Sequence, residues 1–160
     1  MLDLPPLSTL SRRRSAEDDL RLVVFQLGST VYGVDVETVH AIYHALPLIP
    51  VTQSGAKIEG YLRLPGGALP VVDLRRFTDL PLQSHHKELI DWIVVVNRGS
   101  EQIGFIVDEV TEVLKLHVSA LQHVSGSGSA SRFPVRAVVR SQGREVLIPD
   151  LSLLISEATN

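Results

Sequence analysis

The stretch Leu22-Val-Val-Phe-Gln-Leu-Gly28 opens a pattern of apolar residues and glycines that the chain uses twice. A shift of 71 positions places Gly28 on Gly99 and Gly33 on Gly104. The same shift superimposes three aliphatic positions of the first half on three of the second: Val36, Val39 and Ile42 on Val107, Val110 and Val113. A later stretch repeats at a shift of 77, which places Asp73-Leu74 on Asp150-Leu151. One long-period repeat of this kind indicates a single duplication, not a solenoid.

The duplication predicts two similar small β folds in series. We expect a flexible tail at 1–18 and subdomain halves at approximately 20–80 and 90–157. Runs of β-branched and aromatic residues predict about five short strands in each half. Pro65-Gly66-Gly67, between two such runs, is the strongest hairpin signal. A sheet that small leaves open edges unless it curls closed, so we expect a mainly β, all-β chain of two packed barrels.

Short helical segments are expected at a few places. Val36, Val39 and Ile42 have the spacing of one or two helical turns, and the matching stretch from Val110 suits a short helix or a bent strand. Asp73 and Asp150 each end a strand and precede a predicted turn, where a carboxylate caps free backbone N–H groups. Asp150 or Ser152 can therefore cap a final helix over 151–157.

The composition limits the classes of function. The chain has 160 residues, of which 44% are hydrophobic and 21% charged, and its formal net charge is −3. It has no cysteine, which excludes disulfides, thiolate catalysis and cysteine-ligated zinc. No apolar run approaches the roughly 20 residues that span a bilayer, and the first residues lack a signal-peptide core. We expect a cytoplasmic protein with no direct membrane insertion.

Candidate catalytic and metal-binding groups are few. His40 and His44 are four residues apart, a spacing that can place two imidazoles on one helix face, but a surface pair without a ligand role is favoured. His85-His86 lies in the connector between the halves and is a weaker metal candidate still. No phosphate-binding loop or catalytic triad occurs at a motif spacing. We therefore expect no enzyme activity, no catalytic residues, no cofactor and no metal.

Charged side chains leave an alternative open. Several arginines could form the basic stripe of a nucleic-acid-binding small barrel: Arg63, Arg75, Arg76, Arg132, Arg136, Arg140 and Arg144. Aromatic residues make up only 5% of the chain, and the net charge is negative, so this remains the second hypothesis. Asp108, Glu109 and Glu112 could meet a basic partner or form a solvated face.

Aliphatic positions give the first hypothesis. Val39, Ile42, Val110 and Val113 are matched between the halves. If they flank the joint between the two barrels, they could line a hydrophobic groove for an amphipathic helix; if not, they are ordinary core. Trp92, at the start of the second half, could belong to the same joint.

An ordered set of segments resembles the CheW family of chemotaxis coupling proteins. The set is Leu22 to Gly28, Tyr32-Gly-Val-Asp-Val36, Ile58-Glu-Gly60, Leu69-Pro-Val-Val-Asp-Leu-Arg75, Ile103-Gly-Phe-Ile-Val-Asp108 and Val110 to Leu114. The resemblance covers roughly residues 20–157. It implies two five-stranded, SH3-like barrels sharing a core, in a non-enzymatic adaptor that ties the cytoplasmic tips of methyl-accepting chemoreceptors to a CheA-type histidine kinase.

The resemblance also assigns candidate contacts. It implies a receptor-helix groove at Val39, Gly60, Val110 and Val113, to which the matched position Ile42 adds. It implies contact with the regulatory domain of the kinase at the hairpin, with Arg63, Pro65 and Gly66 as candidates, and self-association or contact with other CheW-like domains. This chain departs from the family pattern at Pro65, where the family has an arginine, and at Ala41, where it often has an acid. A coupling protein for another chemosensory-type output, such as surface motility, fits these departures.

Overall fold

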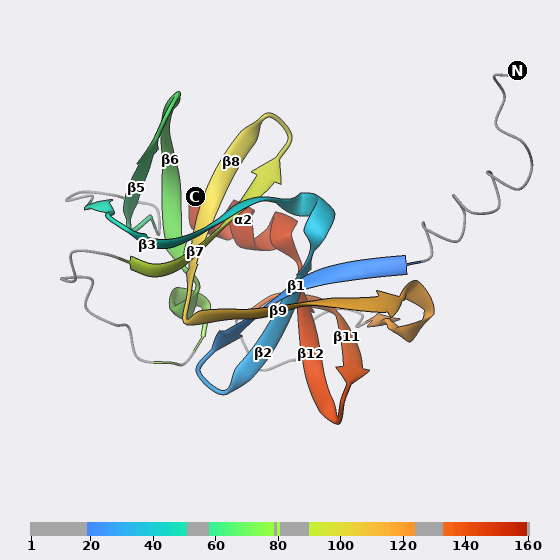
Figure 1. The fold of residues 1–160 in the computed structure, drawn as a ribbon. Coiled ribbons are helices and arrows are strands. Elements are labelled where there is room, and N and C mark those ends of the chain that lie inside the picture. The colour runs from blue at the N-terminus through green and yellow to red at the C-terminus, as the bar shows by residue number, and fades with distance from the viewer. Residues whose placement is uncertain (1–18, 51–57, 79, 81–89, 124–132, 160) are drawn as a thin grey trace, which may run out of the picture.

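The computed structural model describes residues 19–50, 58–78, 80, 90–123 and 133–159. Strands dominate and form two sheets, here called sheet A and sheet B (Figure 1). Sheet A has the order β10-β11-β12-β2-β1-β9, and sheet B has the order β3-β7-β8-β6-β5-β4. The expected tail at 1–18, His85-His86 and Arg132 lie outside the described residues.

The strands of sheet A come from both halves of the chain. They are β1 (Asp19–Leu27), β2 (Thr30–Asp35), β9 (Glu109–His117), β10 (Gln122–His123), β11 (Val135–Ser141) and β12 (Arg144–Pro149). Sheet B is built from β3 (Val39–Leu46), β4 (Ile49–Pro50), β5 (Gly60–Leu64), β6 (Gly67–Asp73), β7 (Ile90–Arg98) and β8 (Glu101–Val107). Each sheet thus has five longer strands and one strand of two residues. The predicted fold class, mainly β with two five-stranded subdomains, is confirmed.

The assignment of one subdomain to each half, 20–80 and 90–157, is wrong at the level of strand pairing. The first hairpin, β1–β2, joins the sheet of β9–β12, and β7–β8 joins the sheet of β3–β6. Each hairpin joins the other sheet through a parallel strand pairing: β2 pairs with β12, and β8 pairs with β6. Under the 71- and 77-residue shifts, each of the five longer strands of one sheet has its counterpart in the other. The duplicated units have therefore exchanged hairpins across a pseudo-twofold axis.

Three apolar clusters hold the structure together. The largest, here called the central cluster, lies between the sheets and includes Val23, Phe25, Val94 and Val96. A second cluster lies within the sheet A subdomain around Leu22 and Val146, and a third lies within the sheet B subdomain around Val71, Ile93 and Ile106. Burial of apolar surface is the main favourable term in folding, so the central cluster fixes how the two subdomains sit together.

Short helical segments complete the structure, and η1, η2 and α2 contribute residues that belong to the central cluster or pack against it. They are the 3₁₀ turns η1 (Val36–Thr38), η2 (Leu74–Phe77) and η3 (Val118–Ala120) and the C-terminal helix α2 (Leu151–Thr159). The Asp73 carboxylate accepts a hydrogen bond from the Arg75 N–H at 2.9 Å, and Asp150 accepts one from the Leu153 N–H at 3.1 Å. Both predicted caps are confirmed. No helix in the described part of the chain is long and apolar enough to cross a membrane.

A β-bulge replaces the helix expected at 36–42. The 3₁₀ turn ends at Thr38, and β3 pairs with β7 with a register shift between Val39 and Ala41, so that His40 is the extra residue. The equivalent shift in β9 leaves Thr111 as the extra residue. A bulge adds one residue and thus turns the period-two alternation of a strand into a three-residue step. The spacing from Val39 to Ile42 and from Val110 to Val113 therefore records a bulged strand.

Candidate functional site

The four matched aliphatic residues lie on the two edge strands that flank the junction between the sheets. Val39 and Ile42 are on β3, which ends sheet B, and Val110 and Val113 are on β9, which ends sheet A. Val39 and Val110 are partly buried against the central cluster. Ile42 is 38% exposed and Val113 is 58% exposed.

The cross-strand partners of these residues show which way they face. Ile42 lies opposite Val94 on β7, and Val113 lies opposite Val23 on β1. Val94 and Val23 are buried members of the central cluster, and directly opposite residues point to the same face of a sheet. Ile42 and Val113 are thus the solvent-facing continuation of the interface between the subdomains. We call the face formed by β3, β7, β1 and β9 the seam surface.

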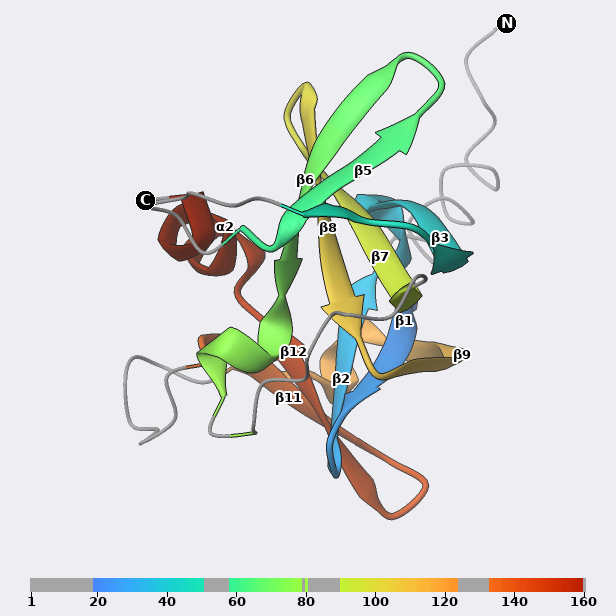
Figure 2. The ribbon, with the colours of Figure 1, turned by 90° about the vertical axis from the view of Figure 1, so that its left-hand side faces the viewer.

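The structure places both edge strands on one side of the molecule. In Figure 2, β3 and β9 lie on the same side, and α2 lies on the opposite side. Trp92, opposite His44, packs against the central cluster, so its predicted place in the joint is confirmed. Of the large hydrophobic side chains on β3 and β9 that the structure describes, Ile42 and Val113 are the two that are exposed.

Gly60 is not brought to this surface. It begins β5, pairs with Pro50 and Val71, and is buried where the β4 backbone crosses it. A methyl group on Gly60 would overlap the carbonyl oxygen of Ile49. Gly60 is thus a position in the sheet B subdomain where the β4 backbone lies too close to leave room for a side chain.

The kinase-contact candidates lie together at the tip of the β5–β6 hairpin. Arg63, Pro65 and Gly66 are exposed. Pro65 precedes Gly66 at φ 95°, as in a type II turn with proline first and glycine second. Pro65 and Gly66 also line a shallow pocket of about 330 Å³ with His40 and Tyr43 of β3. The hairpin thus presents an exposed tip in which Pro65 restricts one backbone position.

The arginines proposed for a nucleic-acid stripe are largely paired with carboxylates. Arg75 is bound to Asp108, Arg76 to Glu59 and Arg144 to Glu112. Asp108 and Glu112 are therefore engaged within the fold and do not form a free acidic face. The paired arginines have their charges offset locally, so the structure gives the nucleic-acid hypothesis no basic groove in the described residues.

The histidines do not form a metal site among the described residues. His40 and His44 lie on a strand, with His40 in the bulge and the His44 ring 4.4 Å from the Trp92 ring. In the part of the chain that the structure describes, no group of three or more histidine or acidic side chains could hold a metal ion.

One titratable group is perturbed by burial. Tyr32 stacks between Phe25, at 5.7 Å between ring centroids, and Phe133, at 4.5 Å. Desolvation in this apolar setting disfavours the phenolate, so burial raises the pKa of Tyr32 above its usual value of 10.0. Tyr32 belongs to the central cluster, so its raised pKa affects how the stability of the fold depends on pH.

Comparison with known proteins supports the resemblance. The family model of the CheW-like domain matches residues 21–159. The chain is 23% identical to the chemotaxis protein CheW of Thermotoga maritima, over 88% of this chain and 91% of that protein. It is 26% identical to the chemotaxis protein CheW of Treponema pallidum, over 88% of this chain and 84% of that protein.

A solved structure shares the fold. The crystal structure of the scaffolding protein TtCheW from Thermoanaerobacter tengcongensis aligns with a TM-score of 0.71 at 23% sequence identity, covering 82% of this chain and 88% of that one. The family match covers nearly all of the described residues. The chain belongs to the CheW-like domain family.

Proposed function

We propose that this chain is a non-enzymatic chemosensory adaptor that couples methyl-accepting chemoreceptors to a CheA-type histidine kinase by docking both. The carrying observation is the exposed aliphatic pair Ile42 and Val113 at the junction of the two sheets. The names of the relatives, a chemotaxis protein and a scaffolding protein, support the same role. Such an adaptor is cytoplasmic and reaches the membrane only through receptor arrays.

Receptor docking would use the seam surface. An amphipathic helix of a receptor tip lays its apolar face on Ile42 and Val113, with Val39 and Val110 beneath. Ile42 and Val113 offer apolar surface to the partner, and their removal from water supplies the affinity. No bond is made or broken, and no cofactor is needed.

Kinase docking would use the β5–β6 hairpin. Pro65 restricts the backbone of the tip, which lowers the entropy that binding must remove. Arg63 supplies an exposed cation one strand position from the turn. The partner surface is the CheW-like regulatory domain of the kinase.

A paired pull-down tests the two contacts separately. Val113→Asp should abolish capture of a soluble chemoreceptor tip fragment and leave kinase capture intact, because a carboxylate would be desolvated in the contact. Leu153→Asp is the matched control, since Leu153 is 52% exposed on α2, on the other side of the molecule.

The hairpin has its own control within the chain. Arg63→Glu should weaken kinase capture, and Arg140→Glu, at the equivalent place in the β11–β12 hairpin, should not. Equal receptor capture by folded Val113→Asp and wild type contradicts the groove. Equal kinase capture by Arg63→Glu and wild type contradicts the hairpin contact.

A further inference from the structure

We propose that the pocket beside the tip of the β5–β6 hairpin receives one uncharged aromatic side chain, a tyrosine or a tryptophan, from the regulatory domain of the kinase. We call this pocket the hairpin hollow; it is lined by His40, Tyr43, Gln102 and residues 64–69. The inference rests on the proposed docking of the kinase at the hairpin and deepens it. It names the residues that receive the partner and the kind of side chain that they select.

The repeat explains why a hollow exists in the sheet B subdomain. In the sheet A subdomain, Arg144 directly follows the turn of the β11–β12 hairpin and is bound to Glu112 of β9. The 77-residue shift places Gly67 on Arg144, and the other shift places Ala41 on Glu112. Glycine and alanine cannot form such an ion pair, so no equivalent pair bridges the β5–β6 hairpin and β3. A hollow of about 330 Å³ lies between these elements.

The glycines of the turn keep the hollow open. Gly66 and Gly67 have φ values of 95° and 148°, which residues with a side chain rarely adopt. A methyl group added at either position would meet no atom within 4 Å beyond its chain neighbours, so empty space lies beside the backbone. A side chain of this chain at either position would be strained. The tip therefore leaves room for a side chain that comes from a partner.

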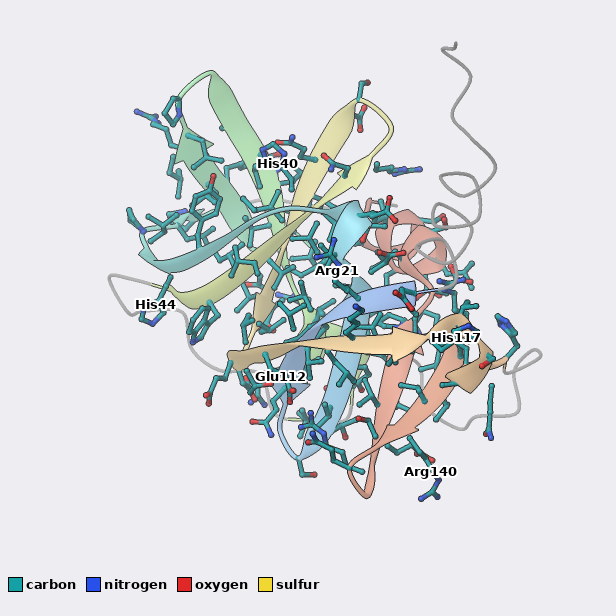
Figure 3. All side chains as sticks on the ribbon, turned by 45° about the vertical axis from the view of Figure 1, so that its right-hand side comes forward. Arg21, His40, His44, Glu112, His117 and Arg140 are labelled. Atoms are coloured by element: carbon teal, nitrogen blue, oxygen red, sulfur yellow. The ribbon has the colours of Figure 1, made fainter. Side chains whose placement is uncertain are left out.

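The hollow is continuous with the proposed kinase contact. Pro65 and Gly66, two of the contact candidates, line it themselves, and Arg63 directly precedes its lining residue Leu64. In Figure 3, His40 lies between the β5–β6 and β7–β8 hairpins, at the entrance of the sheet B subdomain. The volume is at the lower end of the range from roughly 300 Å³ upward that is typical of ligand pockets. A partner bound at the tip would therefore cover the hollow and could fill it with one large side chain.

The lining disfavours a charged occupant. Among the described residues that line the hollow, none is an aspartate, glutamate, lysine or arginine. A guanidinium or a carboxylate covered there would lose its water without gaining a strong counter-ion, which costs free energy. His40 is the one basic side chain of the lining, and histidine side chains are generally uncharged at pH 8. The hollow thus selects an uncharged side chain at that pH.

The mixture of apolar and polar groups in the lining favours an aromatic ring with one polar atom. Leu64, Pro65 and Leu69 offer apolar surface, and His40 and Gln102 carry groups that can donate or accept hydrogen bonds. The side chains that contribute most to binding at protein interfaces are tryptophan, tyrosine and arginine. The lack of a carboxylate in the lining removes arginine. Tyrosine and tryptophan each combine a ring with one O–H or N–H and so match both parts of the lining.

Kinase capture by variants of His40 tests the hollow. His40 is the exposed extra residue of the β3 bulge, so its replacement should leave the fold intact. At pH 8, His40→Glu should weaken kinase capture about tenfold, because its carboxylate would lose water beside an uncharged ring. The neutral variant His40→Gln should bind nearly as well as wild type. Thr111→Glu adds the same charge at the equivalent bulge of β9 and should leave kinase capture unchanged.

Side-chain probes test the chemistry of the hollow without the kinase. N-acetyltyrosinamide should cause saturable shifts of the NMR methyl signals of Leu64 and Leu69 in the full chain, and N-acetylargininamide should not. His40→Glu should reverse this preference, because the new carboxylate supplies a counter-ion for the guanidinium.

The outcomes separate the hollow from the hairpin contact. Equal kinase capture by folded His40→Glu and wild type overturns the hollow, while the hairpin contact stands if Arg63→Glu still weakens capture. Equal shifts with both probes, or no shift with N-acetyltyrosinamide, overturn the selection of an aromatic side chain. Wild-type capture by both His40→Glu and Arg63→Glu overturns kinase docking at the hairpin as well.

Discussion

The guanidinium of Arg75 binds the carboxylate of Asp108 in a bidentate ion pair that joins the two sheets. The distances are 3.1 Å from Nε to Oδ1 and 2.6 Å from Nη2 to Oδ2. Asp108 also accepts the Gly28 N–H at 2.7 Å, and its own N–H donates to the Gln26 carbonyl at 3.0 Å. Arg75 follows sheet B and Gly28 turns between two strands of sheet A, so one carboxylate ties the subdomains together.

Removing this carboxylate should destabilise the fold. Asp108→Ala takes the ion-pair partner from Arg75, which is 9% exposed, and the acceptor from Gly28. We expect a loss of about 3 kcal/mol in the free energy of unfolding, because the largely buried Arg75 guanidinium loses two hydrogen bonds to a carboxylate and the Gly28 N–H loses its acceptor. Urea unfolding measures it. Glu145→Ala, which breaks only the exposed 4.0 Å pair with Arg140, should cost less than about 0.5 kcal/mol. Similar losses of stability for both variants would contradict the role of Asp108 in joining the two sheets.

The buried tyrosine predicts an alkaline loss of stability. The folded-state pKa of Tyr32 is raised above the unfolded value of 10.0, so the folded state holds the phenol proton more tightly. The associated stability is present below pH 10.0 and is lost as the pH rises above it towards the folded pKa. Tyr32→Phe should show a shallower fall in the free energy of unfolding over this alkaline range. Parallel pH profiles of the two proteins would count against burial of the phenol.

Gly60 offers a test of steric crowding against backbone strain. Gly60→Ala should cost at least about 2 kcal/mol, since the added methyl meets the Ile49 backbone, which cannot move without shifting β4. Gly99→Ala adds a methyl into open space at φ 59° and should cost about 1 kcal/mol from conformation alone. Thermal unfolding ranks the two, and a smaller loss at Gly60 would refute the close approach.

Local patterns in the sequence were enough to predict most of the longer strands, the hairpin and the caps, but not β3, which was expected to be helical. Alternating apolar residues define β5 and β6, Pro65-Gly66 defines their turn, and Asp73 and Asp150 sit where their carboxylates meet free N–H groups. These features depend on residues close in the chain, so a single sequence carries them.

Pairing over long distances was not accessible in the same way. The two halves have the same pattern, so pairing within a half and exchange between halves satisfy the apolar pattern equally well. The bulges at His40 and Thr111 gave a three-residue spacing that a helix also gives. The Arg75–Asp108 pair could not be predicted from the repeat, because the positions equivalent to Arg75 and Asp108 hold Ser152 and Glu37.

The aliphatic members of the seam surface were predicted from the sequence. Val39, Ile42, Val110 and Val113 were matched by the repeat, and the structure places all four at the junction of the sheets.

Methyl-labelled NMR of the unmodified protein tests the central claim most directly, because it needs no substitution that could disturb folding. On addition of a soluble chemoreceptor tip fragment, the methyl signals of Ile42 and Val113 should shift or broaden, and those of Leu153 on α2 should stay in place. Saturable changes confined to the seam surface are the predicted result. Binding of the fragment with the Ile42 and Val113 signals unmoved would contradict the account.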